Sequence, residues 1–170
     1  RLGIVRPDGA VHGAVLLDLG GVLADQLLVD LGVLAWARGL GEDQRLERRQ
    51  ATRLEQWLRD EGRTVVRTRE PGGTEVGALI RDIVLHHRGD VAARAEALLY
   101  AADRAHHVAT LVRPALARGE IVIQDRYLDS SVAYQGAGRV LDAAQIRDLS
   151  LWATECALPD LTVLLDLDPA

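Results

Sequence analysis

The side chains best suited to chemistry in this sequence are arginines that follow short apolar runs. Arg69 follows the run at residues 64–66, and Arg126 follows the run at residues 121–123. A planar guanidinium group matches the oxygens of a phosphate, so paired arginines suit a dianionic phosphate group. The chain has only three tyrosines: Tyr100, Tyr127 and Tyr134. An aromatic ring can stack on a flat base, so this stretch of the chain suits a ligand with both a phosphate and a ring.

The elements that must position these residues alternate between strands and helices. Short apolar runs predict strands at residues 64–66, 121–123 and 161–167. Amphipathic spacing predicts helices over about residues 51–58, 76–84, 91–118 and 142–155. Gly62 is a candidate C-cap, Asp142 a candidate N-cap, and Pro114 should end or kink the third helix. This alternation predicts an α/β fold with a parallel sheet and helices on both faces.

In such folds ligands bind at the carboxyl ends of the parallel strands. Arg69 and the pair Asp125–Arg126 follow two of the predicted strands. We therefore expect these residues to face one crevice.

Three segments then resemble the bacterial type of thymidylate kinase (dTMP kinase). They are Thr68–Thr74 (TREPGGT), Leu98–Arg104 (LLYAADR) and Asp125–Gly136 (DRYLDSSVAYQG). Each is weak alone, but their order and spacing together are specific. The resemblance covers roughly residues 50–170 and implies a three-layer P-loop kinase-like domain over residues 51–170. Residues 1–50 form an unmatched or degenerate N-terminal segment.

The resemblance implies a role for each matching residue. Arg69 and Arg126 would bind the phosphate of dTMP, with Arg126 bridging the acceptor and transferring phosphates. Tyr100 would stack on thymine and Arg104 would hydrogen-bond the base edge. The remaining substrate-binding residues are Ser131, Tyr134 and Gln135, with Tyr134 crowding the sugar. Asp125 would help to position Mg²⁺, and ATP would be the phosphoryl donor. The resemblance further implies a cytoplasmic enzyme and allows a homodimer.

The sequence departs from this family where ATP should bind. A P-loop has the sequence G-x-x-x-x-G-K-[ST]. By its distance from the helix that follows, it should fall at about residues 41–50. The central strand that precedes the loop should then be residues 32–36 rather than residues 14–17. Glu47 stands at the lysine position, and all 20 of the Lys and Arg residues in the chain are Arg. The family's arginine-bearing lid and adenine loop are also missing after Ala170. We therefore expect an impaired phosphate-donor site.

Composition excludes several other classes of protein. The net charge of −5 and pI of about 5.5 argue against stable binding of nucleic acid. Asp18, Asp25 and Asp30 interrupt the apolar stretch at residues 11–36, which argues against a membrane span. Cys156 is the only cysteine, so neither an internal disulfide nor a cysteine-based zinc site can form.

The function predicted from the sequence is ATP-dependent phosphorylation of dTMP to dTDP, impaired in this chain. The alternative is a non-catalytic nucleotide-binding or interaction module that keeps the dTMP pocket.

Overall fold

The computed structural model describes residues 2–5, 11–13, 27–33, 40–87, 89–132 and 141–165. The chain divides into two compact units. The sheet unit comprises Arg1–Thr68, Ala115–Arg126 and Leu158–Ala170, and the helical unit comprises Arg69–Pro114 and Tyr127–Ala157. Each unit is described here by itself.

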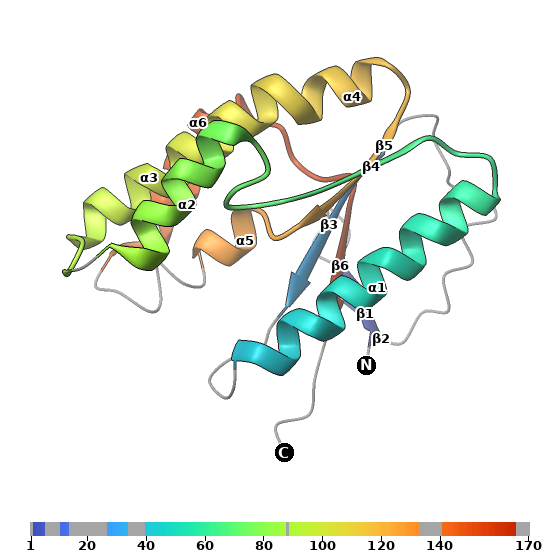
Figure 1. Cartoon of the computed structure of the whole chain (residues 1–170), viewed down its shortest axis with the longest axis horizontal. Helices are drawn as coiled ribbons and strands as arrows, with labels where there is room; N and C mark the ends of the chain where they lie inside the picture. Colours follow the sequence, from blue (N-terminus) through green and yellow to red (C-terminus); the bar gives the residue numbers. More distant parts are fainter. Residues whose placement is uncertain are drawn as a thin grey trace. The chain divides into compact units, whose positions relative to one another are not determined.

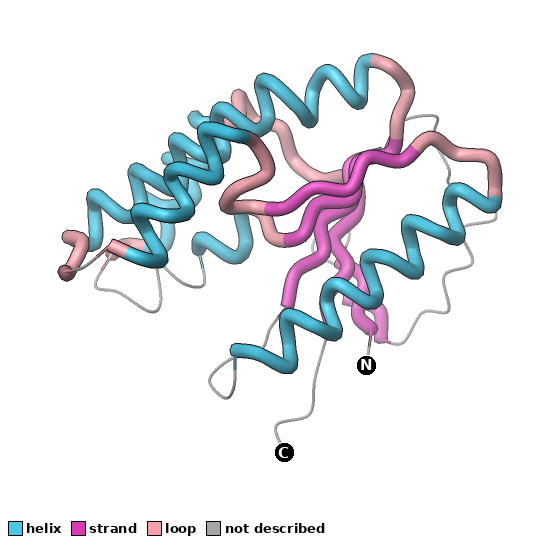
Figure 2. Tube along the Cα trace, viewed as in Figure 1, coloured by secondary structure: helices cyan, strands magenta, loops and turns pink. Residues whose placement is uncertain are grey.

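A six-stranded sheet forms the sheet unit (Figure 2). Its strands are β1 (Leu2–Val5), β2 (Val11–Gly13), β3 (Leu27–Val33), β4 (Val65–Arg69), β5 (Ile121–Asp125) and β6 (Leu161–Leu165), in the spatial order β2-β1-β6-β3-β5-β4. The central strand β3 runs parallel to both of its neighbours, β5 and β6. The three strands predicted from the sequence correspond to β4, β5 and β6.

Helix α1 (Leu40–Asp60) lies along the sheet and buries one face on it (Figure 1). Ala51, Leu54 and Leu58 follow helical spacing and form its apolar stripe. They pack in one core cluster with sheet residues Val65, Ile121, Ile123 and Val163. A fully buried leucine such as Leu58 contributes about 1.5–3 kcal/mol, so this stripe holds α1 on the sheet. The chain then turns at Gly62, whose φ of 79° confirms the predicted C-cap.

The sheet differs from the prediction on its β1 side. A purely parallel sheet was expected, but β1 pairs antiparallel with both β2 and β6. The central strand also begins earlier than expected, at Leu27–Val33 instead of residues 32–36. Asp30 and Gly32 interrupt the apolar run of β3, which hides the strand from a search for uniformly apolar segments. The competing candidate at residues 14–17 lies outside the described residues.

The expected P-loop position is also wrong. Residues 41–50 belong to α1, so they form a helix and not a phosphate-binding loop. Glu, Gln, Arg and Leu dominate this stretch and are good helix formers, whereas a P-loop needs glycines inside the loop. The segment that joins β3 to α1 is residues 34–39, whose sequence LAWARG contains no lysine and a single glycine.

The helical unit is built from α2 (Glu75–His86), α3 (Ala93–His107), η1 (Val108–Val112), α5 (Leu128–Ser131) and α6 (Ala143–Ala153). Helix α3 packs against both α2 and α6. The side chain of Thr74 caps α2 by accepting a hydrogen bond from the Gly77 N–H at 2.9 Å. Asp142 caps α6 by accepting from the Ala144 N–H at 3.0 Å, which confirms the predicted N-cap.

The long helix predicted over residues 91–118 is continuous but changes its winding. One π-helical turn, η1, joins α3 to α4 (Arg113–Ala117), and the Arg113 N–H donates to the Val108 carbonyl. Pro114 has no N–H, and its ring would clash with the carbonyl four residues earlier in a regular α-helix. The wider turn removes that clash, so Pro114 neither ends the helix nor breaks it.

Candidate functional site

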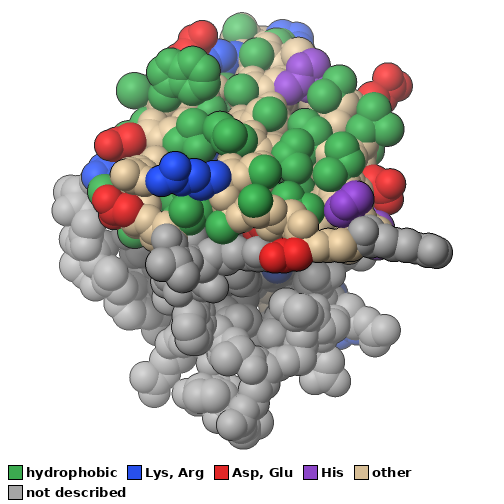
Figure 3. Space-filling model, turned by 90° about the vertical axis from the view of Figure 1, so that its left-hand side faces the viewer, with side chains coloured by type: hydrophobic (Ala, Val, Ile, Leu, Met, Phe, Trp, Pro, Cys, Tyr) green, Lys and Arg blue, Asp and Glu red, His purple; other side chains and the backbone are tan. Residues whose placement is uncertain are grey.

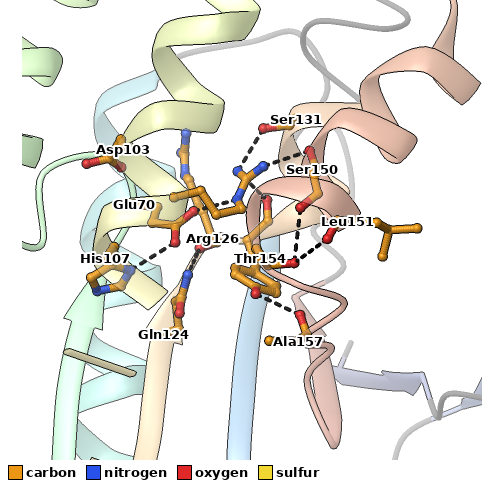
Figure 4. Close-up of polar contacts among 12 residues, drawn as sticks. Glu70, Asp103, His107, Gln124, Arg126, Ser131, Ser150, Leu151, Thr154 and Ala157 are labelled. Atoms are coloured by element: carbon orange, nitrogen blue, oxygen red, sulfur yellow. Dashed lines mark hydrogen bonds and ion pairs between the residues drawn. The ribbon is translucent and has the colours of Figure 1, made fainter. Parts of the chain in front are cut away.

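A buried arginine, Arg104, is the centre of the polar network in the helical unit. Its side chain is 3% exposed, and its guanidinium group donates four hydrogen bonds. The acceptors are Glu70 Oε2 at 2.7 Å, Ser150 Oγ at 2.9 Å, Ser131 Oγ at 2.8 Å and the Tyr127 carbonyl at 3.3 Å. In Figure 4 Glu70, Ser131 and Ser150 point toward the same central group. Three segments of the chain, around Glu70, Tyr127–Ser131 and Ser150, therefore hold one guanidinium group.

Glu70 joins Arg104 to a second buried side chain. Its other oxygen, Oε1, lies 2.9 Å from Nδ1 of His107 (Figure 4). Glu70 comes directly after β4, and the Glu70–Pro71 peptide bond that follows is cis. An unpaired buried charge is costly, so a carboxylate with two partners is the arrangement that allows Arg104 to be buried.

Tyr100 lies on the same side of α3 as this network. Tyr100, Arg104 and His107 follow the spacing i, i+4, i+7, which places them on one helix face. Tyr100 is half-buried, whereas Arg104 and His107 are fully buried. The ring of Tyr127 lies 5.5 Å from the Arg104 guanidinium carbon, a cation–π distance. An aromatic surface and a fixed cation thus lie one turn apart.

Asp103 is a second buried carboxylate beside this face. Its Oδ1 accepts a hydrogen bond from the Gly72 N–H at 3.3 Å, and its Oδ2 has no hydrogen-bond partner among the described residues. Burial, and after it the nearby charge of Glu70, raises the pKa of Asp103 above its ordinary value of 3.8. This side chain holds the Gly72 turn and is neutralised more easily than an exposed aspartate.

The sheet unit contributes the end of β5, where Asp125 is followed by Arg126. Arg126 has a φ of 69°, in the left-handed region that residues other than glycine rarely adopt. The Gln124 side chain donates to the Arg126 carbonyl at 3.1 Å and holds this conformation. Such backbone conformations cost about 1–3 kcal/mol and cluster at functional sites. Arg126 therefore shares with Glu155 and Cys156 a backbone conformation that costs stability.

The predicted site residues divide between the two units. Arg69 ends β4 and is exposed, Tyr100, Arg104 and Ser131 lie in the helical unit, and Asp125 and Arg126 lie in the sheet unit. The structure brings Arg104 and Ser131 together. Tyr134 and Gln135 lie outside the described residues. The common crevice of Arg69 and Arg126 stays a prediction.

Sequence reasoning missed three members of the Arg104 network. Glu70 lies inside the TREPGGT segment, but only its neighbour Arg69 was singled out. His107 is three residues from Arg104 and hence on the same helix face, which the spacing could have indicated. Ser150 gives no sequence signal, because its 46-residue separation from Arg104 is bridged only by tertiary packing.

The described residues do not fit ATP. Residues 41–50 are helical, and no lysine is present in the chain to neutralise a donor phosphate. No group of three or more His, Cys, Asp or Glu side chains within the described residues could hold a metal ion. Asp125 alone could serve only a Mg²⁺ whose other ligands are phosphate oxygens and waters. None of the described helices is long and apolar enough to cross a membrane.

Comparison with known proteins decides the family. Residues 48–170 match the family model described as thymidylate kinase. The chain belongs to the thymidylate kinase family. The predicted family and the predicted P-loop kinase-like α/β fold are both confirmed. The enzymes of this family are kinases, as the names of its relatives state.

Two curated relatives and one solved structure show how far the similarity extends. Thymidylate kinase of Leifsonia xyli subsp. xyli is 78% identical over 119 residues, which are 70% of this chain and 57% of the relative. That of Clavibacter sepedonicus is 73% identical over 121 residues, 71% of this chain and 57% of the relative. The chain thus spans little more than half the length of these thymidylate kinases.

The crystal structure of thymidylate kinase from Ehrlichia chaffeensis is similar with a TM-score of 0.67 and 29% identity. The match covers 84% of this chain and 77% of that chain.

Proposed function

We propose that this thymidylate kinase chain binds dTMP through the Tyr100–Arg104 face of α3, and that its reaction is ATP-dependent phosphorylation of dTMP to dTDP. The observation that carries the proposal is the fixed, charge-compensated guanidinium of Arg104, one helical turn from Tyr100. A group of this kind suits the carbonyl oxygen of a neutral base. An arginine has no acceptor, so it favours the carbonyl at position 4 of thymine over the amino group of cytosine.

We assign the phosphate of dTMP to the two other arginines among the predicted site residues, Arg69 and Arg126. Arg69 ends β4 and Arg126 follows β5, so both stand where strands of an α/β sheet present ligand-binding residues. The left-handed backbone of Arg126 supports a functional role over a structural one. In the proposed reaction Arg126 contacts the acceptor and transferring phosphates and offsets charge that develops between them. Asp125 supplies one carboxylate toward Mg²⁺. Ser131, Tyr134 and Gln135 complete the pocket for base and sugar.

We propose further that turnover by this chain is impaired. A phosphate cradle and its lysine stabilise the charge of the transferring phosphoryl group. Because residues 41–50 are helical and the chain contains no lysine, the described residues do not supply this stabilisation. Loss of about 4 kcal/mol of transition-state stabilisation corresponds to a rate roughly a thousandfold lower.

The same observation favours a second candidate function. A chain with the dTMP side chains and with no donor-phosphate cradle among its described residues would act as a non-catalytic nucleotide-binding or interaction module. For both candidate functions we place the protein in the cytoplasm, where it would encounter dTMP and ATP. They share the dTMP site and differ only in turnover.

One pair of measurements tests both candidates on the full chain. Calorimetry with dTMP, dCMP and UMP tests the site: tighter binding of dTMP supports it, and equal, negligible binding of all three contradicts it. An ATP-coupled assay of dTDP formation tests turnover. A rate at least about a thousandfold below that of a complete relative supports impairment. A normal rate contradicts it, and dTMP binding with no rate at all favours the non-catalytic module.

We also propose that two copies of the chain associate through an apolar stripe on α2. Val76, Leu79 and Ile83 have helical spacing and are 44%, 68% and 45% exposed. Leu98 on the neighbouring helix α3 is 57% exposed. Figure 3 shows a face of the chain on which hydrophobic side chains predominate and charged ones lie mainly at the edge. A two-fold axis would pair this stripe with its own copy and remove it from water.

A further inference from the structure

We propose that Glu70 and Ser150 are positioning residues that leave Arg104 a single N–H donor for a ligand. Neither residue belongs to the phosphate or base contacts assigned above. The proposal concerns how the guanidinium group is held. Its consequence for base selection rests on the proposed dTMP site.

The first step concerns how many N–H groups of the Arg104 guanidinium are already hydrogen-bonded. An arginine has five N–H donors, one on Nε and two on each terminal nitrogen. Nε donates to Glu70, and Nη2 donates to both Ser131 and the Tyr127 carbonyl. Nη1 donates to Ser150. Among the described residues this leaves one N–H on Nη1, so a bound base can receive one hydrogen bond and not a bidentate pair.

The second step concerns the positive charge of the Arg104 guanidinium group, which Glu70 compensates. Glu70 Oε2 lies 2.7 Å from Nε, and both side chains are 3% exposed. A carboxylate at this distance compensates the positive charge within the network. A bare guanidinium would attract any phosphate or carboxylate that reached it. The paired one is suited to a neutral carbonyl acceptor, and Glu70 is therefore the residue that directs Arg104 toward a base.

Ser150 carries the third step, because it occupies one of the two N–H groups of Nη1. Without Ser150 both N–H groups of Nη1 would be unbonded, so two donors rather than one would be open to a ligand. Ser150 is itself 2% exposed and lies on α6, where Thr154 Oγ1 donates to its carbonyl at 3.0 Å. It is therefore held by its own helix and can hold Arg104 in turn.

The first test measures the guanidinium group directly in the ligand-free full chain. Arginine side-chain ¹⁵N NMR, with Arg104→Lys to identify the signals, should show separate, slowly exchanging Nη protons for Arg104. Ser150→Ala should speed their exchange about fivefold, the effect of one lost hydrogen bond. Ser150→Thr keeps the hydroxyl and should restore slow exchange. Gln145→Ala on the exposed side of the same helix is the control. Wild-type exchange in Ser150→Ala would overturn the positioning role.

The second test measures selection by calorimetry with dTMP, dCMP and deoxyribose 5-phosphate. In Ser150→Ala the preference for dTMP over dCMP should fall about fivefold. In Glu70→Gln dTMP should bind more weakly, and the surface variant Glu61→Gln should match wild type. Deoxyribose 5-phosphate lacks the base, so its Kd should stay constant in Ser150→Ala and in Glu61→Gln. Thermal unfolding of each variant checks that it folds.

The two tests separate this proposal from the proposed function. If wild type fails to bind dTMP, the proposed function fails, and the NMR result still decides whether Ser150 positions Arg104. If wild type prefers dTMP and the preference survives in Ser150→Ala, the proposed function stands and the role of Ser150 in base selection is overturned.

Discussion

Gly77 leaves the space that the Asp103 carboxylate occupies. A Cβ atom at position 77 would collide with Oδ1 of Asp103 and would lie 3.0 Å from Oγ1 of Thr74, the N-cap of α2. The same Oδ1 accepts the N–H of Gly72, so one glycine, one aspartate and one turn are fitted to each other. Helix α2 can approach α3 this closely only because residue 77 has no side chain.

Replacing Gly77 should therefore destabilise the chain. Gly77→Ala gains about 1 kcal/mol of helix propensity but forces an overpacked contact, which costs about 1–3 kcal/mol. The contact is with a buried, hydrogen-bonded carboxylate rather than a flexible chain end, so we expect the cost to exceed the gain, with a net loss of stability of up to about 2 kcal/mol. Urea unfolding at neutral pH measures it.

A double-mutant cycle with Asp103→Ala tests whether the Asp103 contact causes this loss of stability. In an Asp103→Ala background the penalty of Gly77→Ala should fall, and only the closer packing against Thr74 and the Gly72 backbone should remain. A penalty of equal size in both backgrounds would mean that the Asp103 contact is not responsible.

The raised pKa of Asp103 predicts how stability depends on pH. Because its folded pKa lies above 3.8, the folded state binds its proton more tightly than the unfolded state does. The contribution of Asp103 to stability is therefore highest below 3.8 and falls as pH rises through the folded pKa. Asp103→Asn keeps an acceptor for the Gly72 N–H and removes the charge. We expect a higher free energy of unfolding for this variant at pH 7.

Denaturant titrations between pH 4 and pH 8 test this sign. The advantage of Asp103→Asn over wild type should shrink as the pH is lowered toward 4. Asp129→Asn is a suitable control because Asp129 is exposed. An advantage that grows toward low pH would contradict the expectation.

The left-handed backbone of Arg126 predicts opposite effects on stability and binding. Arg126→Gly removes the conformational penalty and should raise the free energy of unfolding by about 1 kcal/mol. It also removes a guanidinium proposed to contact the phosphate, so dTMP should bind more weakly. Arg69→Gly is the matched control, because a glycine within strand β4 should lower stability while also weakening dTMP binding. A loss of both properties in Arg126→Gly would show that its backbone conformation is not strained.

The apolar stripe on α2 predicts concentration-dependent association. Leu79 is the most exposed of its large apolar residues, at 68%. Leu79→Glu should shift the chain to monomers in sedimentation velocity, because two like charges would meet across a two-fold interface. Arg94→Glu on α3 adds a negative charge at another exposed position and should not change the association. A wild-type chain that is monomeric at every concentration would exclude this dimer.

Much of the fold could be predicted because its signals are local. The apolar runs of β5 and β6, the stripe of α1 and the cap at Asp142 depend on neighbours a few residues away. Strand β3 was placed too late because Asp30 and Gly32 interrupt its pattern. The hairpin β1–β2 was missed, although Pro7–Asp8–Gly9 between its strands is a turn sequence.

The candidate site could be predicted only in part, for a related reason. The resemblance to the thymidylate kinase motifs predicted Arg104 and Ser131 as ligand-binding residues. The pairing of Arg104 with Glu70 and Ser150 depends on separations of 34 and 46 residues. No periodicity or propensity encodes such contacts. The position of the donor-phosphate loop was wrong because it was counted back from a helix that begins at Leu40 and not at residue 51, where its apolar spacing suggested.

Tyr100 supplies the last prediction, because it is the aromatic surface of the proposed base site. Tyr100→Ala should weaken dTMP binding by about 1–3 kcal/mol, or roughly 5-fold to 150-fold in Kd, the usual effect of removing one stacked ring. Tyr100→Phe keeps the ring and should retain nearly all of the affinity. Calorimetry on the full chain measures both variants. Deoxyribose 5-phosphate has no base to stack, so its Kd should not change in either.

If Tyr100→Phe loses as much affinity as Tyr100→Ala, the hydroxyl rather than the ring makes the contact. If neither variant changes the Kd of dTMP, the base lies elsewhere and the proposed site is wrong.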